Sequence, residues 1–278
     1  MLSIENLKKE IFFLPFEKGD LFSIYYHPIN DSPEKEVILY IHPFADEMNK
    51  SRRMAALQAM SFARAGFGVL QIDLPGCGDS QSEFVGASWD AWKDSINTAI
   101  HWLNMKGNGS IHLWGLRLGA LLMMDWAKDA LIPIEKYIFW QPVLKGALAM
   151  NQFFRLASAS RMMGKDGESL KEIRETIGRG QTVEIGGYEL NPGLVKAIEN
   201  MKMEDLSPPK GSRIIWKNIS LNAPPDIGPA NRKVIDLFEQ NGCRIDAESI
   251  TGNAFWNSVE ISILPDLITS TTNSMISG

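Results

Sequence analysis

Short apolar runs alternate with helix-forming segments along the first half of this chain. EVILYI at 36–41 and FGVLQID at 67–73 are nearly continuous apolar runs, as in strands that are buried on both faces. Between them, residues 54–66 repeat apolar positions at helical spacing and stop at Gly66. This strand–helix–strand rhythm predicts an α/β domain whose central sheet is mostly parallel, with helices on both faces.

The same rhythm continues over most of the chain. The further elements that we expect are an opening hairpin at 9–15 and 21–28, a helix at 88–105 that begins at Ser88, strands at 110–114 and 136–140, a strand at 213–219, a helix near 230–241 and a strand near 243–250. The tail at 269–278, TSTTNSMISG, lacks core-forming residues. With 278 residues, the chain is long enough for one large domain or for a domain with an insertion.

Residues 144–211 break this rhythm. They contain several methionines, charged helical stretches and the sequence QTVEIGGYEL, which predicts a small hairpin about Gly186-Gly187. Pro208-Pro209 close the segment. We therefore expect a helical cap at 144–211, inserted into a core that is made of residues 1–143 and 212–278.

A Gly-x-Arg-x-Gly turn at 115–119 gives the sharpest local signal. It follows the expected strand at 110–114 and leads directly into a helix. In α/β-hydrolases the same strand–turn–helix context carries Gly-x-Ser-x-Gly, the nucleophile elbow. The glycines permit a tight, strained turn that holds the middle side chain above the edge of the sheet. The context therefore favours an α/β-hydrolase fold.

Arg117 stands at the position of the nucleophile in this turn. Its guanidinium is protonated at any working pH and has no lone pair for attack, so it cannot replace Ser or Cys. The start of the following helix favours an anion. Two interpretations stay open: Arg117 is a structural strut that pairs with an internal carboxylate, or it belongs to a site for an anionic ligand.

The histidines do not supply a triad. The chain has four of them, His27, His42, His101 and His112. The triad His of α/β-hydrolases follows the last core strand, which would place it within 251–256, where TGNAFW contains none. Asp226 lies near the expected position of the triad acid, and without a His to orient we expect it to be a plain loop or capping residue. No intact catalytic set is therefore expected.

The loop after the strand at 36–41 faces the elbow in this fold and supplies an oxyanion-hole N–H. Because Pro43 has no N–H, Phe44 or Ala45 would donate, with Leu118 as the second donor. The charged residues of 42–53 form either a solvated helix start or a pocket wall, in which Glu47, Asn49, Arg52 or Arg53 faces Arg117. The candidate ligand-binding residues are Arg117, Leu118, His42, Phe44, Glu47, Asn49, Arg52, Gln141 and Trp256.

Composition narrows the class of protein. Hydrophobic residues make up 45% and charged residues 22% of the chain, as in ordinary globular proteins, and the net charge of −5 argues against nucleic acid as a partner. The two cysteines, Cys77 and Cys243, suggest neither a disulfide framework nor a zinc site, and we expect no metal and no cofactor. No apolar run approaches the roughly 20 residues of a membrane span, and the start lacks a signal-peptide layout. We expect a cytoplasmic protein.

Four motifs in order resemble a known bacterial family, the type 2 hydrolase associated with the exosortase A system. The motifs are HPFADEMNKSRRM at 42–54, DLPGCGDS at 73–80, LWGLRLGALL at 113–122 and WQPVLKG at 140–146. The resemblance covers most of the chain and is densest from 36 to 146. It implies an α/β-hydrolase fold and a gene neighbourhood for exopolysaccharide production and protein sorting. Arg at the elbow agrees with this family's pattern, and a companion type carries Cys there.

Three functions follow as hypotheses. The leading one is a non-catalytic or atypical homologue that binds a small anionic or acylated ligand beneath its cap. The second is an atypical ester hydrolase or acyltransferase, with water held by His42 together with Asp46 or Glu47. The third is a scaffold that binds exopolysaccharide-pathway proteins or a second copy of itself, for which a Met-rich cap offers adaptable apolar contacts.

Overall fold

The computed structural model describes residues 7–29, 36–106, 109–162, 169–222, 224–258 and 260–277. Its main sheet has eight strands in the order β1-β2-β4-β3-β5-β6-β9-β10. The strands are β1 (Lys9–Leu14), β2 (Leu21–Tyr26), β3 (Glu36–Ile41), β4 (Gly68–Ile72), β5 (Ser110–Leu116), β6 (Lys136–Trp140), β9 (Arg213–Ser220) and β10 (Arg244–Thr251). Only β1 with β2 and β2 with β4 pair antiparallel, and the other pairs are parallel. The predicted mostly parallel sheet is confirmed.

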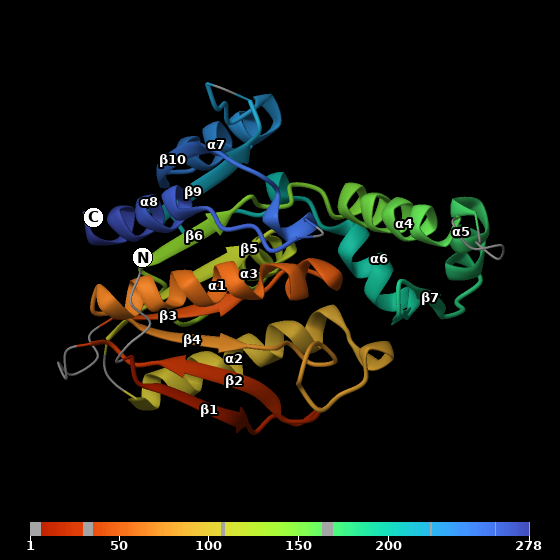
Figure 1. Ribbon diagram of the computed structural model, residues 1–278, viewed down its shortest axis with the longest axis horizontal. Coiled ribbons are helices and arrows are strands. Elements are labelled where there is room, and N and C mark those ends of the chain that lie inside the picture. Colours follow the sequence, from red (N-terminus) through yellow and green to blue (C-terminus); the bar gives the residue numbers. More distant parts are fainter. Residues whose placement is uncertain are drawn as a thin grey trace.

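Helices cover both faces of this sheet (Figure 1). On one face lie α1 (Asp46–Arg64) and α8 (Pro265–Ile276), which contact each other. Their buried side chains share one hydrophobic core. On the other face, α2 (Trp89–Lys106), α3 (Leu118–Ala127) and α7 (Pro229–Gln240) contribute to a second core. Among the described helices, none combines the length and the apolar character that crossing a bilayer requires.

The two cores explain why the central strands are apolar throughout. Side chains of a strand point alternately to opposite faces of the sheet. In β3, Leu39 packs into the core under α2 and α3, while Tyr40 packs into the core under α1. In β5, Leu113 and Trp114 divide in the same way. Every residue of these two strands after the first is therefore buried, and the sequence shows no polar alternation.

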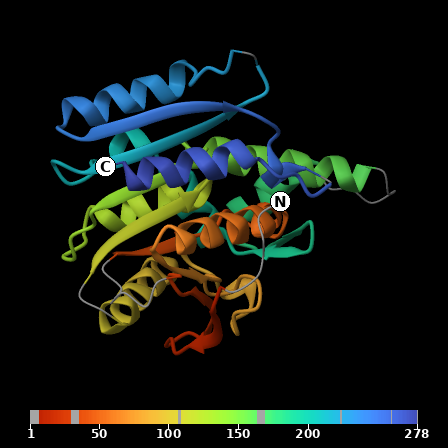
Figure 2. The same cartoon turned by 60° about the vertical axis from the view of Figure 1, so that its left-hand side comes forward.

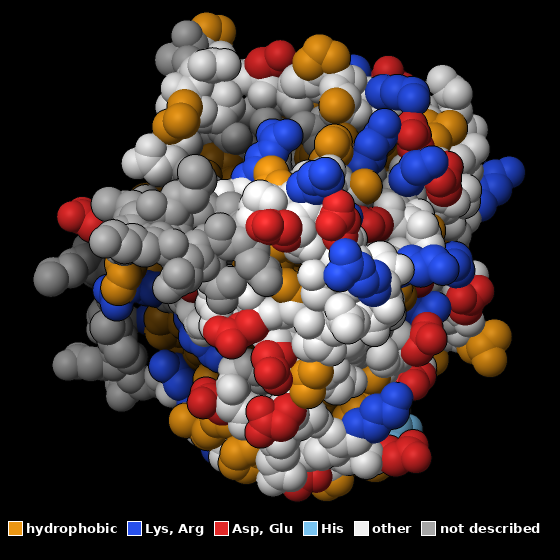
Figure 3. All heavy atoms as spheres, turned by 90° about the vertical axis from the view of Figure 1, so that its right-hand side faces the viewer, with side chains coloured by type: hydrophobic (Ala, Val, Ile, Leu, Met, Phe, Trp, Pro, Cys, Tyr) orange, Lys and Arg blue, Asp and Glu red, His pale blue; other side chains and the backbone are white. Residues whose placement is uncertain are grey.

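The segment between β6 and β9 contains α4 (Gly146–Met162), α5 (Leu170–Gly178), the hairpin of β7 (Val183–Ile185) and β8 (Tyr188–Leu190), and α6 (Pro192–Asn200). We call residues 144–211 the cap segment, after the expectation for this part of the chain. In Figures 1 and 2 it extends away from the sheet, coloured green to teal. Figure 3 views the molecule from that end, where acidic and basic side chains are interspersed with separate hydrophobic ones.

The C-terminal tail differs from the sequence-based expectation. Most of 269–277 belongs to α8, which is packed against the core. The hydroxyl of Thr271 accepts a hydrogen bond from Trp140 Nε1 at 2.9 Å, and that of Thr272 accepts one from Gln58 Nε2, also at 2.9 Å. Buried hydroxyls are tolerated when they meet such partners. The tail is therefore part of the fold, and its polar composition concealed this.

His112 is buried in the middle of β5. Its side chain has no exposed surface, and Glu36 Oε1 is 4.0 Å from its Nε2. Neither ring nitrogen has a hydrogen-bond partner among the described residues. Burial, aided by the positive charges of Lys136 and Arg213, lowers the pKa of His112 from 6.5 to about 3. The ring therefore stays neutral in the folded protein over the whole mildly acidic range.

Acidification below about pH 6.5 is expected to destabilise the fold through this residue. The unfolded chain binds a proton at His112 there and the folded chain does not, so the free energy of unfolding falls by up to about 1.4 kcal/mol per pH unit. The replacement His112→Phe removes this part of the slope, whereas His101→Gln, at an exposed position, leaves it intact. Denaturant unfolding at pH values from about 7 down to about 5 measures the slopes. An unchanged slope in His112→Phe contradicts the assignment.

Candidate functional site

The predicted elbow is the junction of β5 and α3. Arg117 has φ 55° and ψ −115°, a conformation that side-chain-bearing residues rarely adopt. A Cβ atom on Gly119 would lie 2.2 Å from the carbonyl oxygen of Ile41, and one on Gly115 would lie 2.6 Å from Ala120 Cα. Both glycines are therefore required by close backbone approach, which is the reason for the Gly-x-x-x-Gly spacing.

The Arg117 side chain is engaged on two sides. Its Nε donates to Glu47 Oε1 at 3.2 Å, and its Nη2 lies 3.2 Å from the same oxygen. The guanidinium carbon is 5.2 Å from the centroid of the Trp256 ring. Only 15% of the Arg117 side chain and 28% of the Glu47 side chain are exposed. A carboxylate and an aromatic face thus meet the cation, as a structural strut requires.

The pKa of Glu47 is subject to two opposing effects. Burial raises the pKa of Glu47, and the charge of Arg117 opposes that rise. The guanidinium itself cannot give up its proton. Loss of Glu47 would therefore leave a largely buried charge without a partner, which is costly for the fold.

A small cavity lies beside Leu118, the first residue of α3. The cavity that touches Leu118 and Phe44 has a volume of about 10 Å³, which is room for a single water molecule at most. Phe44 is fixed there by the ring of Phe153 from α4, with 5.1 Å between the ring centroids. Ala45, the residue before α1, has φ 50° and ψ −127°, close to the conformation of Arg117. Two strained residues, Arg117 and Ala45, therefore lie at the starts of α3 and α1.

His42 is held by the backbone on both ring nitrogens. Its Nδ1 donates to the carbonyl oxygen of Pro43 at 2.7 Å, because Nε2 accepts the N–H of Leu74 at 3.0 Å. The side chain is only 4% exposed, and burial lowers its pKa. This arrangement leaves neither nitrogen to hold a water with Asp46 or Glu47. His42 therefore lacks the free nitrogen that the atypical hydrolase hypothesis requires of it.

Gln141 acts at a strand end. Its Oε1 accepts a hydrogen bond from the N–H of Ile219 at 2.6 Å, which ties the end of β6 to β9. Asp226, near the expected acid position, is exposed, and its backbone oxygen accepts hydrogen bonds from the side chains of Asn218 and Ser249. These residues stabilise loops at the carboxyl edge of the sheet.

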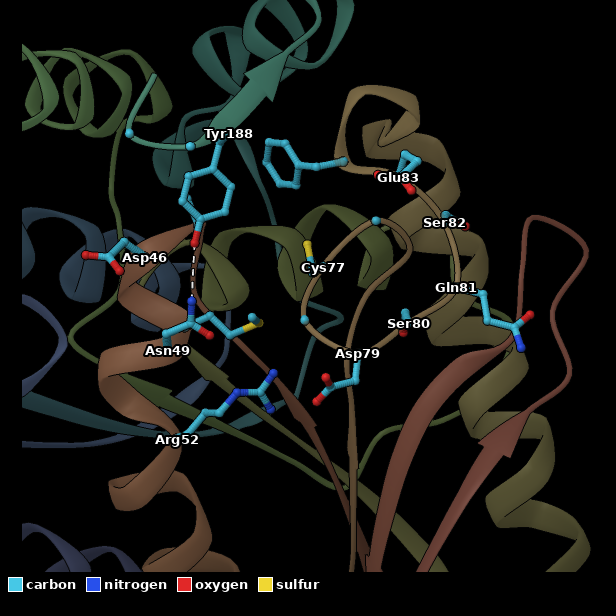
Figure 4. A pocket seen from close by; sticks show the side chains of 17 residues that line it. Asp46, Asn49, Arg52, Cys77, Asp79, Ser80, Gln81, Ser82, Glu83 and Tyr188 are labelled. Atoms are coloured by element: carbon cyan, nitrogen blue, oxygen red, sulfur yellow. Dashed lines mark hydrogen bonds between the residues drawn. The ribbon is translucent and has the colours of Figure 1, made fainter. Parts of the chain in front are cut away.

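Asn49 and Arg52 line a different cavity, which we call the trough. It has a volume of about 840 Å³ and lies between α1, the loop at 76–84 and the β7–β8 hairpin (Figure 4). Asn49 Nδ2 donates to the Tyr188 hydroxyl at 3.3 Å, so the hairpin is linked to α1 across one end. Arg52 donates to both carboxylate oxygens of Asp73, at 3.2 and 2.8 Å.

The trough carries a negative charge. The positive charge of Arg52 is compensated by Asp73, and Asp46 pairs with Lys50 at 2.8 Å. Asp79 and Glu83 also line it, and neither has an ion-pair partner among the residues that the structure describes. An anion would therefore be repelled. Within the same described ranges, no group of three or more His, Cys, Asp or Glu is placed to hold a metal ion.

Sequence reasoning missed several members of the trough. Asp79 and Glu83 come from the glycine-containing loop that follows β4, and Tyr188 comes from the cap segment. A Cβ atom on Gly78 would lie 2.0 Å from an Asp73 carboxylate oxygen, so this glycine lets the loop fold over the Arg52 pair. The motif DLPGCGDS indicated a turn-rich loop after β4. It did not indicate that this loop lies opposite α1 and the β7–β8 hairpin.

The cap segment is fixed against this side of the core. Asn191 Nδ2 donates to the carbonyl oxygens of Val85 and Ala87, both at 2.8 Å. The rings of Phe84 and Tyr188 meet edge to face, with 5.1 Å between their centroids. These contacts close the trough on the side of the cap segment.

Comparison with known proteins supports the fold. No model of a protein family matches the sequence, and no curated protein matches it either. Among solved structures, Est1E from Butyrivibrio proteoclasticus with bound ferulic acid matches with a TM-score of 0.66 at 15% identity, covering 96% of this chain and 98% of that one.

Two further structures match over similar lengths. XC6422 from Xanthomonas campestris, a serine hydrolase without a lid, has a TM-score of 0.58 at 14% identity and covers 97% of this chain and 94% of its own. Proline iminopeptidase from Mycobacterium smegmatis has a TM-score of 0.59 at 13% identity, with 96% and 98% covered. At these identities the similarity shows the fold alone: the chain has an α/β-hydrolase fold.

The elbow geometry predicts that the cost in stability of replacing a glycine by alanine differs strongly between Gly119 and Gly178. Gly119→Ala places a methyl group against the Ile41 carbonyl and is expected to cost more than about 3 kcal/mol of unfolding free energy, or to prevent folding. Gly178→Ala, near the end of α5, has nothing within 4 Å of the added methyl group and is expected to be neutral or stabilising. Denaturant unfolding of the two variants measures the difference. Equal stabilities would refute the close approach.

Proposed function

We propose that this protein is a non-hydrolytic member of its fold that binds a small ligand between core and cap segment. The observation that carries the proposal is the Arg117–Glu47 pair, stacked on Trp256, at the position of the nucleophile. A cation that is already neutralised by a carboxylate can neither attack an ester nor provide an unpaired charge for an anionic ligand. On this proposal the elbow is structural, and the ligand lies elsewhere.

The trough is the place that we propose for the ligand. Its volume of about 840 Å³ lies in the range of small-molecule sites. It offers donors and acceptors from Asn49, Arg52 and Asp79, together with the edges of two aromatic rings. Since its unpaired carboxylates repel anions, the acylated ligand class suits it better than the anionic one.

The sequence motifs supply the biological part of the proposal. They resemble the type 2 hydrolase of the exosortase A system, so we place the protein beside exopolysaccharide production and protein sorting in a bacterial cytoplasm. Pathway proteins or a second copy of the chain are then the partners to test. The name of that family speaks of hydrolysis, whereas a paired guanidinium at the position of the nucleophile argues against it.

Turnover and binding can be tested on the same samples. The wild-type protein is expected to hydrolyse p-nitrophenyl acetate and butyrate no faster than buffer. Arg117→Ser is expected to stay equally inactive, because a serine there still lacks an imidazole base. Circular dichroism establishes that the variant is folded. Esterase activity that is lost on Arg117→Ala would sink the proposal.

The binding arm uses a neutral acylated probe, triacetin, with acetate as the anionic comparison. Triacetin is expected to raise the melting temperature of the wild-type protein, and acetate is not. Asn49→Trp narrows the trough and removes the hydrogen bond to Tyr188, so it should weaken the response, whereas Arg53→Trp, on the same helix outside the trough, should keep it. A response to acetate alone, or one that Asn49→Trp leaves undiminished, contradicts binding in the trough.

A further inference from the structure

A second, apolar cavity lies beneath the trough. It has a volume of about 150 Å³, lies between α1 and the face of the sheet formed by β2, β4 and β3, and is partly open to solvent. Aromatic and aliphatic side chains form most of its wall, among them Phe22, Ile24, Tyr26 and Tyr40. It is separate from the elbow, because neither Arg117 nor Glu47 lines it.

The cavity follows from the choice of residues on α1. Ala55 and Ala56 stand opposite the sheet at this point, and their methyl groups are too short to fill the space in front of β2 and β4. The remaining α1 residues at the cavity, Met48 and Arg52, line it on the side of the trough. Protein interiors are normally close-packed, so a cavity of this size between a helix and a sheet requires an explanation.

Gln71 gives the cavity a polar group with an unused donor. The other polar lining residues are already engaged, because Arg52 is paired with Asp73 and His42 is hydrogen-bonded to the backbone. In the sheet, Gln71 is paired with Ile24 of β2 and with Tyr40 of β3. Its side-chain amide therefore lies between an aliphatic and an aromatic side chain on the same face of the sheet. The side-chain nitrogen Nε2 is buried, and no described residue accepts a hydrogen bond from it. A buried donor without a partner is costly, and a ligand oxygen in the cavity would relieve that cost.

We propose that this cavity binds a small apolar group, about the size of a benzene ring, that carries one carbonyl oxygen. An apolar cavity of roughly 150 Å³ is large enough for benzene itself. The hydrocarbon part of the ligand packs against the aromatic and aliphatic walls, and its carbonyl oxygen accepts the hydrogen bond from Gln71 Nε2. Acyl and aroyl groups are the chemical class that meets both requirements.

The cavity and the trough share a boundary. Met48 and Arg52 line both of them. A ligand that places its acyl group in the cavity can therefore extend past these two side chains and leave a polar remainder in the trough. The inference rests on the proposed ligand-binding function and specifies the group by which the ligand is held.

Two shape-matched probes test the role of Gln71. Cyclohexanone and methylenecyclohexane have the same six-membered ring, but only the ketone has an oxygen that can accept a hydrogen bond, where the other molecule has a CH₂ group. Binding is followed by NMR, from the Gln71 side-chain amide and the backbone amides of Ala55 and Ala56. In Gln71→Leu the affinity for cyclohexanone is expected to fall about ten-fold relative to that for methylenecyclohexane, the size of one hydrogen bond to a buried group.

A second variant tests the cavity itself. Ala56→Leu fills the space and is expected to abolish saturable binding of both probes, whereas Arg53→Leu, on the exposed side of α1, leaves both affinities unchanged. The inference is overturned if the wild-type protein binds neither probe, or if Gln71→Leu leaves the affinity ratio unaltered. Turnover of p-nitrophenyl acetate in the same samples would count against the non-hydrolytic function alone, so the two failures remain distinguishable.

Discussion

The ion pair between Arg117 and Glu47 links three distant parts of the chain. The strained turn after β5 fixes the position of the Arg117 backbone. The first turn of α1 supplies Glu47, at a place where the helix dipole favours a carboxylate. Trp256, which follows β10, covers the guanidinium from the other side. Since a buried guanidinium must be paired, these three segments have to meet at the carboxyl edge of the sheet. The rest of the site is arranged around that meeting point.

The pair also decides where chemistry is feasible. Among the cavities described above, the one that Leu118 lines has a volume of about 10 Å³, and His42 is hydrogen-bonded to the backbone through both ring nitrogens. An ester-cleaving reaction at the elbow would need a larger cavity beside Leu118 and a His42 with a free ring nitrogen. On the far side of α1, by contrast, the helix leaves the trough and the apolar cavity beside Gln71. Our proposal therefore puts ligand recognition along α1 rather than at the elbow.

The sequence predicted the fold well because buried parallel strands and the Gly-x-x-x-Gly turn are local signals. It also gave Glu47 as one of four residues that could face Arg117, beside the alternative of a solvated helix start. It failed at the tail, where Thr271 and Thr272 are buried by hydrogen bonds from residues far away in the chain. It also did not foresee the trough. Tyr188 and Asp79 approach each other only through tertiary folding, and no periodicity encodes that distance.

A double-mutant cycle at Arg117 and Glu47 tests the structural role of the elbow most directly. Unfolding free energies of the wild type, Arg117→Met, Glu47→Gln and the double variant give the coupling between the two side chains. We expect about 2 kcal/mol for this largely buried pair, against less than about 0.5 kcal/mol for the same cycle at the more exposed Asp46 and Lys50. Additive effects at Arg117 and Glu47 would contradict the account, because the guanidinium would then not depend on that carboxylate.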